Sequence, residues 1–337
     1  MIKEAINLLV SGQSLTEGQA SSVMEEIMNG EATPAQFGAF VTALRLKGEN
    51  IDEIVGLAKT MRSKAVAVVI SAPVVDTCGT GGDGCHTFNI STAAAFVAAG
   101  AGMRVAKHGN RAMSSRCGSA DVLEALGVKI NLNAEQVKRC IEEVGIGFIF
   151  APSFHPAMKH AAAPRREIGI RTVFNILGPL TNPVGAKSQV LGVADCSLLE
   201  KMTIALQVLG CRHALVVHGE DGLDEITVTG KTHICELKDD DINNYSISPD
   251  DLGLPLSSRD SLAGGTLNEN AALLRGVLMG TPGPRQDVVL MNTAAAMLAG
   301  DKVNTLQEGV ILAREAIDDG RARAKLKQLI ELSNSLD

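Results

Sequence analysis

Apolar residues in the first 64 positions occur in runs that are bounded by helix-start signals, with no alternating strand pattern between them. Thr16 begins a capping-box pattern, Thr33 precedes a proline at the first helical position, and Asn50 starts a third run. Because these signals follow one another closely, we expect residues 1–70 to form a small helical subdomain.

From about residue 68 onward, short β-rich runs alternate with helical runs. The strand candidates are residues 74–76, 104–106, 128–130, 147–150, 189–193 and 214–217. The helix candidates between them are residues 91–100, 119–126, 134–144 and 198–209. This alternation predicts a mostly parallel sheet that is covered by helices. Residues 225–228 and 233–236, joined through Gly230, predict an antiparallel hairpin, and the chain is helical again from about Ala271.

The segment from Pro164 to Pro183 does not continue the alternation of strands and helices, because its prolines and glycines predict short helices and turns. We expect it to return to the helical subdomain. The predicted fold class is therefore α/β: a small helical N-terminal subdomain and a larger α/β domain with a mostly parallel central sheet flanked by helices. The predicted division is 1–70, joined by about 166–185, against 71–165 and 186–337.

The composition excludes several classes of protein. A net charge of −7 and only nine aromatic residues in 337 argue against a dedicated nucleic-acid-binding surface. Seven cysteines without a CxxC pair argue against structural zinc and a disulfide framework. The N-terminus lacks the pattern of a signal peptide, and the most apolar stretch, 93–103, is too short to span a bilayer. We expect a cytoplasmic protein with no membrane partner.

A glycine-rich loop follows the first predicted strand, with four glycines among residues 79–84. Glycines permit positive φ angles and expose backbone N–H groups, which can form an anion-binding nest. Further along the chain, Ser91 and Thr92 begin an Ala-rich helix whose positive end faces the same ligand. The pattern predicts a site for a phosphorylated, negatively charged ligand.

Three interpretations of this loop compete. Residues 79–84 match the GxGxxG pattern of a dinucleotide site, but the helix begins only at about Ser91, and the next strand leads to Arg104 and Lys107 rather than to an acid. A Walker loop requires a GK[ST] ending, which is absent here. A plain tight turn is the third interpretation, and the surroundings of the loop decide its meaning.

A second polar cluster follows the next strand. Lys107, Arg111 and Arg116 are cations near the carboxyl end of that strand, where ligands bind in open α/β sheets. Hydroxyl donors are added by Ser114, Ser115 and Ser119. The alternative is a solvated basic loop followed by a good helix cap. Against this alternative, two neighbouring strands both end in loops that are suited to phosphate.

Several long motifs resemble those of the anthranilate phosphoribosyltransferase family of tryptophan biosynthesis. They are GTGGD at 79–83, NIST at 89–92, KHGNR at 107–111, GSADVLE at 118–124, HPAM at 155–158 with PRR at 164–166, RTVFNILGPLTNP at 171–183 and DGLDE at 221–225. The resemblance extends over nearly the whole chain, including the helical N-terminus. It implies transfer of phosphoribose from 5-phosphoribosyl 1-pyrophosphate (PRPP) to the amine of anthranilate, by a homodimer that forms through the helical subdomain.

The resemblance also implies the residues of the PRPP site, with the loop from His108 to Ser115 closing over the ligand. These residues are Gly79, Gly82, Asp83, Thr87, Asn89, Ile90, Ser91, Thr92, Lys107, His108, Gly109, Asn110, Arg111, Ala112, Met113, Ser114, Ser115 and Ser119. Because PRPP is small and highly anionic, backbone amides and a lysine suit it.

The departing pyrophosphate calls for a metal ion. Ser91, Asp224 and Glu225 offer hard oxygen ligands of the kind that Mg²⁺ prefers. An adjacent Asp-Glu pair taken alone is more typical of a solvated turn, and only the resemblance assigns this pair to an Mg²⁺ site.

For anthranilate, the resemblance implies contacts from Gly79, Asn110 and Arg165, whose guanidinium can hold the carboxylate bidentately. Arg166 is equally consistent with a surface charge. His108 and His155 are candidate bases, and whether either assists proton transfer stays open. Since an aromatic amine is already a nucleophile, we expect no indispensable catalytic acid or base.

Two alternatives remain at this point. Pyrimidine nucleoside phosphorylases share the expected fold, but the KHGNR cluster and Arg165 suit PRPP and a carboxylate-bearing acceptor better than phosphorolysis. A nucleic-acid-binding relative without activity is the other alternative, against which the net charge of −7 and the intact acidic pair argue.

Overall fold

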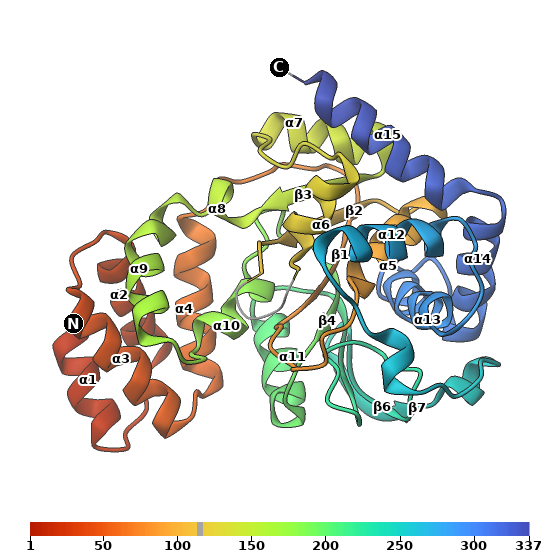
Figure 1. Ribbon diagram of the computed structural model, residues 1–337. Helices are drawn as coiled ribbons and strands as arrows, with labels where there is room; N and C mark the ends of the chain where they lie inside the picture. The colour runs from red at the N-terminus through yellow and green to blue at the C-terminus, as the bar shows by residue number, and fades with distance from the viewer. Residues whose placement is uncertain (113–116, 337) are drawn as a thin grey trace.

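The computed structural model describes residues 1–112 and 117–336, and its N-terminal region is helical as predicted. The first four helices are α1 (Ile2–Val10), α2 (Glu17–Met28), α3 (Pro34–Lys47) and α4 (Ile51–Ser63). Thr16, Thr33 and Asn50 cap α2, α3 and α4, each through a complete capping box. Figure 1 shows these helices, in red and orange, on one side of the sheet.

A seven-stranded sheet within the described residues forms the centre of the larger part of the chain (Figure 1). The strands are β1 (Val75–Gly79), β2 (Val105–Gly109), β3 (Ile146–Phe150), β4 (Ser188–Gly192), β5 (His213–Gly219), β6 (Thr232–Lys238) and β7 (Asp241–Ile247). Their order is β3-β2-β1-β4-β5-β6-β7, with β1 to β5 parallel and β6 and β7 antiparallel. The predicted fold class is confirmed.

Most of the predicted helices are present. They include α5 (Ile90–Gly100), α6 (Ser119–Leu126) and α11 (Leu199–Val208), and the expected helix at 134–144 is α7 (Ala134–Arg139) continued by a π-helical turn (Cys140–Val144). The short helices between β3 and β4 are α8 (Ala151–Phe154), α9 (Lys159–Ile168) and α10 (Phe174–Leu177). The C-terminal helices are α12 (Leu267–Leu278), α13 (Pro284–Ala299), α14 (Leu306–Asp318) and α15 (Arg321–Ser335).

Two strand predictions are wrong, because other partners satisfy the backbone. Residues 128–130 form no strand, and the Lys129 N–H donates instead to Ser333 Oγ of α15 at 3.1 Å. Residues 225–228 form no strand either, since Asn292 of α13 both accepts from the Ile226 N–H and donates to the Ile226 carbonyl. The antiparallel partners of β6 are therefore β5 and β7, the latter not foreseen.

The two faces of the sheet are buried by different layers. Val190 and Leu215 belong to the apolar cluster that contains α5 and α13, whereas their neighbours Leu191 and Val216 belong to the cluster of α11 and the N-terminal helices. Because successive strand residues point to opposite faces, these two layers lie on opposite sides of the sheet. Within the described residues, none of the helices has the length and apolar character needed to cross a membrane.

The segment between β3 and β4 packs on the N-terminal helices. α9 contacts α2 and α3 (Figure 1). The Phe174 ring of α10 lies 5.3 Å, centroid to centroid, from the Phe37 ring of α3. Arg62 of α4 donates to the backbone carbonyl of Leu180. These contacts support the predicted return of residues 166–185 to the helical part, although α9 already packs there from Lys159; the division of the chain stays a prediction.

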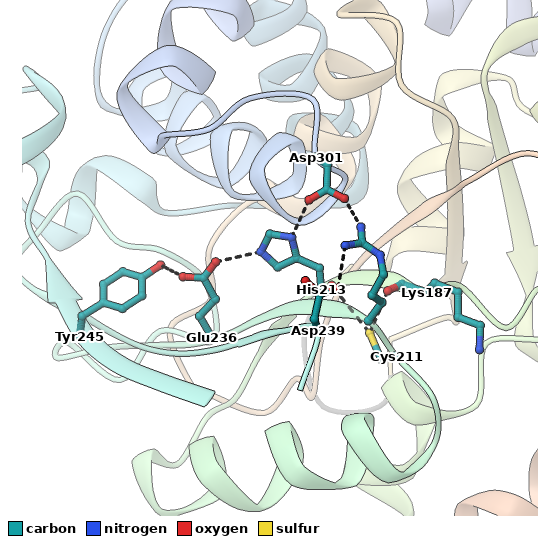
Figure 2. Close-up of polar contacts among 8 residues, drawn as sticks. Lys187, Cys211, His213, Glu236, Asp239, Tyr245 and Asp301 are labelled. Carbon is teal, nitrogen blue, oxygen red and sulfur yellow. Dashed lines mark hydrogen bonds and ion pairs between the residues drawn. The ribbon is translucent and has the colours of Figure 1, made fainter. Parts of the chain in front are cut away.

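A buried polar cluster fixes the antiparallel edge of the sheet to the helices (Figure 2). His213 of β5 is fully buried, with Nε2 2.8 Å from Glu236 of β6 and Nδ1 3.0 Å from Asp301, which follows α13. Tyr245 of β7 donates to the second oxygen of Glu236, and Arg212 pairs with Asp301. This cluster therefore connects three strands and one helix end through side chains alone.

Candidate active site

The site lies where the strand order reverses. The chain proceeds from β1 to β2 and β3 on one side, then returns to β4 on the other side of β1, so the carboxyl ends of β1 and β4 form a topological switch point. These two strands end at Gly79 and Gly192, which are paired in register. Ligands bind at such switch points in open α/β sheets.

Asp224 fits between these two strand ends because both are glycine. A Cβ on Gly79 would overlap the Asp224 carboxyl, and a Cβ on Gly192 would overlap the Asp224 backbone carbonyl. The Gly81 N–H donates to Asp224 Oδ2 at 2.7 Å. Gly79 and Gly81 thus position an acid that lies more than 100 residues further along the chain, with Gly192 on its other side.

Glu225 faces the start of α5 and the end of β2. The Ser91 N–H donates to Glu225 Oε1 at 3.1 Å, at the positive end of the α5 dipole. Lys107 is buried and donates to Ser91 Oγ at 3.1 Å and to the Thr77 carbonyl. The structure therefore brings Ser91, Lys107 and the adjacent pair Asp224 and Glu225 together, from three different segments.

The acid pair is electrostatically unfavourable without a cation. Burial raises the pKa of Asp224 well above its usual range, and the charges of Asp83 and Glu225 raise it further. Burial also raises the pKa of Glu225 to about 7, against the opposing charge of Lys107. Burial lowers the pKa of Lys107 in turn. Lys107 opposes the shift of Glu225, whereas the charges that act on Asp224 are those of two other acids, an arrangement that a further positive charge would stabilise.

The donor set fits Mg²⁺ better than a transition metal. Asp224, Glu225 and the Ser91 hydroxyl present only hard oxygen atoms. In the described part of the chain, no three side chains of His, Cys, Asp or Glu are grouped so as to hold a metal. Since Mg²⁺ commonly keeps waters and substrate phosphates as ligands, two carboxylates are sufficient protein ligands.

The glycine loop is open and presents its backbone. Gly81, Gly82 and Gly84 have φ values of +67°, +71° and +69°, in the left-handed region that favours glycine. Asp83 Oδ1 accepts from the Cys85 N–H at 3.1 Å. The Asn89 side chain donates to the Cys117 carbonyl, and its buried Oδ1 has no partner within the described residues. Thr87 forms a bridge with Ala263.

The loop after β2 is held by acids of α6. Asp121 Oδ2 accepts from the Ala112 N–H at 3.0 Å and from the Gly118 N–H at 2.9 Å. Arg111 is exposed and pairs with Glu124 and with Asp121. The Ser119 hydroxyl donates to the Asn110 carbonyl at 3.3 Å. Three of the predicted PRPP contacts, Met113, Ser114 and Ser115, lie outside the described residues, as does Arg116.

Arg165 lies on α9 with its guanidinium 5.2 Å from the centroid of the Phe174 ring. It is partly buried, and burial lowers its pKa. The stacked, partly desolvated guanidinium is suited to a flat aromatic acid, since it offers both a planar face and a fork of N–H donors. Arg166, in contrast, is exposed.

His108 and His155 are buried side by side, with ring centroids 5.2 Å apart. Burial lowers the pKa of His108 to about 3 and that of His155 to about 4. Both rings are therefore neutral at physiological pH and are weak proton acceptors. This favours the prediction that the reaction needs no protein base.

These histidines give a pH prediction. Because the folded-state pKa of His155 is depressed from 6.5 to about 4, its contribution to stability is complete above pH 6.5 and is lost as the pH falls towards 4. We expect His155→Leu to flatten the pH dependence of the unfolding free energy in this window, by up to about 1.4 kcal/mol per pH unit. Urea titrations between pH 4.5 and 7.5 measure the slope. The control is His160→Leu, at an exposed position; equal slopes in wild type and His155→Leu would contradict the assignment.

Two residues near the site, Asp76 and Arg171, were not predicted as site residues from the sequence. Asp76 is fully buried in β1, accepts from the Asn182 amide at 2.8 Å and from the His108 N–H at 3.3 Å, and burial raises its pKa to about 6. The sequence did contain a signal for Asp76, because an acidic residue is unusual inside a predicted buried strand. Arg171 contacts Gly82, and no sequence signal separated it from the other arginines of its segment.

Comparison with known proteins identifies the family. The profile of the glycosyl transferase family a/b domain matches residues 71–323, and that of the glycosyl transferase family helical bundle domain matches residues 3–65. An anthranilate phosphoribosyltransferase of Dehalococcoides mccartyi is 59% identical over 338 residues, covering 100% of this chain and 99% of the relative. The chain belongs to the anthranilate phosphoribosyltransferase family.

Solved structures of anthranilate phosphoribosyltransferases agree with this assignment. The enzyme of Thermus thermophilus is 44% identical, with a TM-score of 0.93 over 98% of this chain and 99% of that chain. The enzyme of Saccharomyces cerevisiae, in complex with PRPP and Mg, is 29% identical, with a TM-score of 0.91 over 99% and 98% of the two chains.

The family transfers 5-phosphoribose from PRPP to the amino group of anthranilate, giving N-(5-phosphoribosyl)anthranilate and pyrophosphate in tryptophan biosynthesis, and this is the reaction of the chain. Membership excludes the two alternatives, a pyrimidine nucleoside phosphorylase and a nucleic-acid-binding relative without activity.

Proposed function

We propose that PRPP binds at the switch point formed by the ends of β1 and β4, with its phosphates on the glycine loop and the start of α5. The exposed backbone of Gly82 and Gly84, both in the left-handed region, and the α5 dipole support this position. Lys107 supplies a buried positive charge at the same point. Within the described residues, the remaining predicted contacts lie at the start of α5, from Thr87 to Thr92, and after β2, from His108 to Ala112 with Ser119.

Mg²⁺ is proposed to bind at Asp224, Glu225 and Ser91. The observation that carries this proposal is the meeting of two adjacent carboxyls with the glycine loop and the start of α5: Asp224 accepts from the Gly81 N–H and Glu225 from the Ser91 N–H. When bound, the ion neutralises charge that develops on the departing pyrophosphate. The Saccharomyces cerevisiae enzyme in complex with PRPP and Mg supports the same choice of metal.

Anthranilate is proposed to reach the ribose from the side of α9, where Arg165 pairs with its carboxylate and Asn110 and Gly79 contact it. A complex of the Saccharomyces cerevisiae enzyme with 4-fluoroanthranilate supports binding of such a flat acid in this family. The amine carries its own lone pair, so the protein contributes alignment and charge stabilisation rather than proton abstraction. The neutral His108 and His155 line this route without serving as indispensable bases.

Anthranilate fluorescence tests the proposal directly. We expect emission to fall only when enzyme, Mg²⁺ and PRPP are all present, since the amine is consumed in that mixture alone. The omission of each component is the control. Unchanged emission in the complete mixture would refute the assignment.

The setting of the enzyme is also a proposal. We infer a cytoplasmic homodimer that forms through the helical subdomain, residues 1–70 joined by about 166–185. Two apolar side chains on adjacent helices support this interface: Val10 of α1 is 68% exposed and Leu46 of α3 is 83% exposed. The net charge of −7 supports the absence of a nucleic-acid partner.

A further inference from the structure

Arg171 lies on the connection between α9 and α10, where the chain turns back toward the sheet. α9 ends at Gly169, which has a φ of +67°, and the Thr172 N–H donates to Asn175 Oδ1 at 2.9 Å, ahead of α10. Two local features therefore fix the backbone on either side of Arg171. Its side chain extends from the helical segment to the glycine loop.

The guanidinium of Arg171 is in direct contact with Gly82. A Cβ built on Gly82 would overlap Nη1 of Arg171 and would lie 3.3 Å from its Nε. The positive φ of Gly82 favours glycine at this position, and the absence of a side chain leaves room for the guanidinium against its Cα. The contact joins two segments that are about 90 residues apart in the sequence.

The charge of Arg171 is not neutralised by the protein. Among the described residues, neither an ion pair nor a side-chain hydrogen bond engages its guanidinium, although the side chain is only partly exposed. The neighbouring cations are occupied: Arg111 pairs with Glu124 and Asp121, and Arg165 stacks on Phe174. A partly desolvated, unpaired guanidinium beside exposed backbone N–H groups is an incomplete anion site.

We propose that Arg171 is a further ligand of the PRPP phosphates and closes the glycine loop over them from the helical side. The proposal rests on the position proposed above for PRPP. It gives the helical segment a direct role in phosphate binding, in addition to the role of Arg165 toward anthranilate. The fork of N–H donors on the guanidinium matches two phosphate oxygens, as an ammonium cannot.

Two other roles can be imagined for a side chain in this place, and each predicts a different result. A support for the loop would affect both substrates and the stability of the free protein. A second carboxylate ligand would affect anthranilate alone. Contact with Gly82, rather than with the Phe174 stack, favours the phosphate role.

The test compares Arg171→Gln and Arg171→Lys with wild type. Calorimetry measures the dissociation constants of PRPP and of inorganic pyrophosphate, both with Mg²⁺, and steady-state assays measure the KM of each substrate. We expect Arg171→Gln to weaken both phosphate ligands about 10-fold and to change the anthranilate KM less than about 2-fold, with Arg171→Lys intermediate. The salt dependence of PRPP binding should become shallower in Arg171→Gln, since one cation fewer is screened.

Arg166→Gln is the matched control, because it removes the same charge from an exposed position on α9. It should bind PRPP as wild type does. Unchanged PRPP affinity in Arg171→Gln would overturn the proposal, as would equal losses for both substrates together with a lower melting temperature. If wild type itself failed to consume anthranilate, the proposed function would fail, while pyrophosphate binding would still report on Arg171.

Discussion

Replacing Asp224 with Asn and Glu225 with Gln together is expected to lower Mg²⁺-dependent turnover by at least about 1,000-fold. The change keeps the shape of both side chains and removes the two charges that face Ser91 and the glycine loop. Loss of charge stabilisation on a departing pyrophosphate costs several kcal/mol in the transition state, and about 4 kcal/mol corresponds to this factor. Steady-state rates over a range of Mg²⁺ concentrations measure the effect.

Stability separates this result from a folding defect. Two mutually repelling, partly buried carboxyls meet at the site, so their neutral replacements should leave the metal-free protein at least as stable as wild type. Mg²⁺ should raise the melting temperature of wild type but not of the double variant. The control, Glu142→Gln with Glu143→Gln, removes an adjacent acid pair that is exposed. Full activity in the Asp224 and Glu225 variant would show that the metal binds at another site.

Arg165→Ala is expected to raise the KM for anthranilate about 30-fold or more, with a much smaller effect on the KM for PRPP. A charge-assisted bidentate pair with a carboxylate contributes roughly 1.5–3 kcal/mol, and the stacked position of the guanidinium on Phe174 fixes its orientation. Because the planar fork matters as well as the charge, Arg165→Lys should restore only part of the affinity. Initial rates with each substrate varied in turn measure both constants.

Arg166→Ala is the natural comparison, since the neighbouring side chain is exposed and carries the same charge. It should change neither KM by more than about 2-fold. Comparable increases in both KM values for Arg165→Ala would refute the role assigned to Arg165, and would indicate instead that α9 has lost its position against α3.

The sequence predicted those parts of the structure that depend on interactions between residues close together in the chain. The caps at Thr16, Thr33 and Asn50 were predicted because a capping box involves residues only three apart. The parallel sheet was predicted because alternating strands and helices can bury their apolar faces in few other ways. The site motifs were recognisable because phosphate binding requires runs of glycines, hydroxyls and a lysine.

Strand assignment failed where a distant side chain satisfied the backbone. Residues 225–228 are rich in β-branched residues, yet Asn292 occupies the hydrogen-bonding groups of Ile226 that a strand would use. Likewise, Lys129 donates its backbone N–H to Ser333. Local propensity carries no information about such partners, because they lie 66 and 204 residues away in the sequence.

By itself, the sequence determined the helical N-terminus, the α/β class and the residue types of an anion site, because each depends on short-range pattern. Only the tertiary structure decided that the site lies at the β1–β4 switch point. There, two strand-end glycines admit Asp224, and Gly82 lies under Arg171. Contacts between residues about 30 to 145 apart depend on how the chain packs, and packing is decided by shape and burial over the whole molecule.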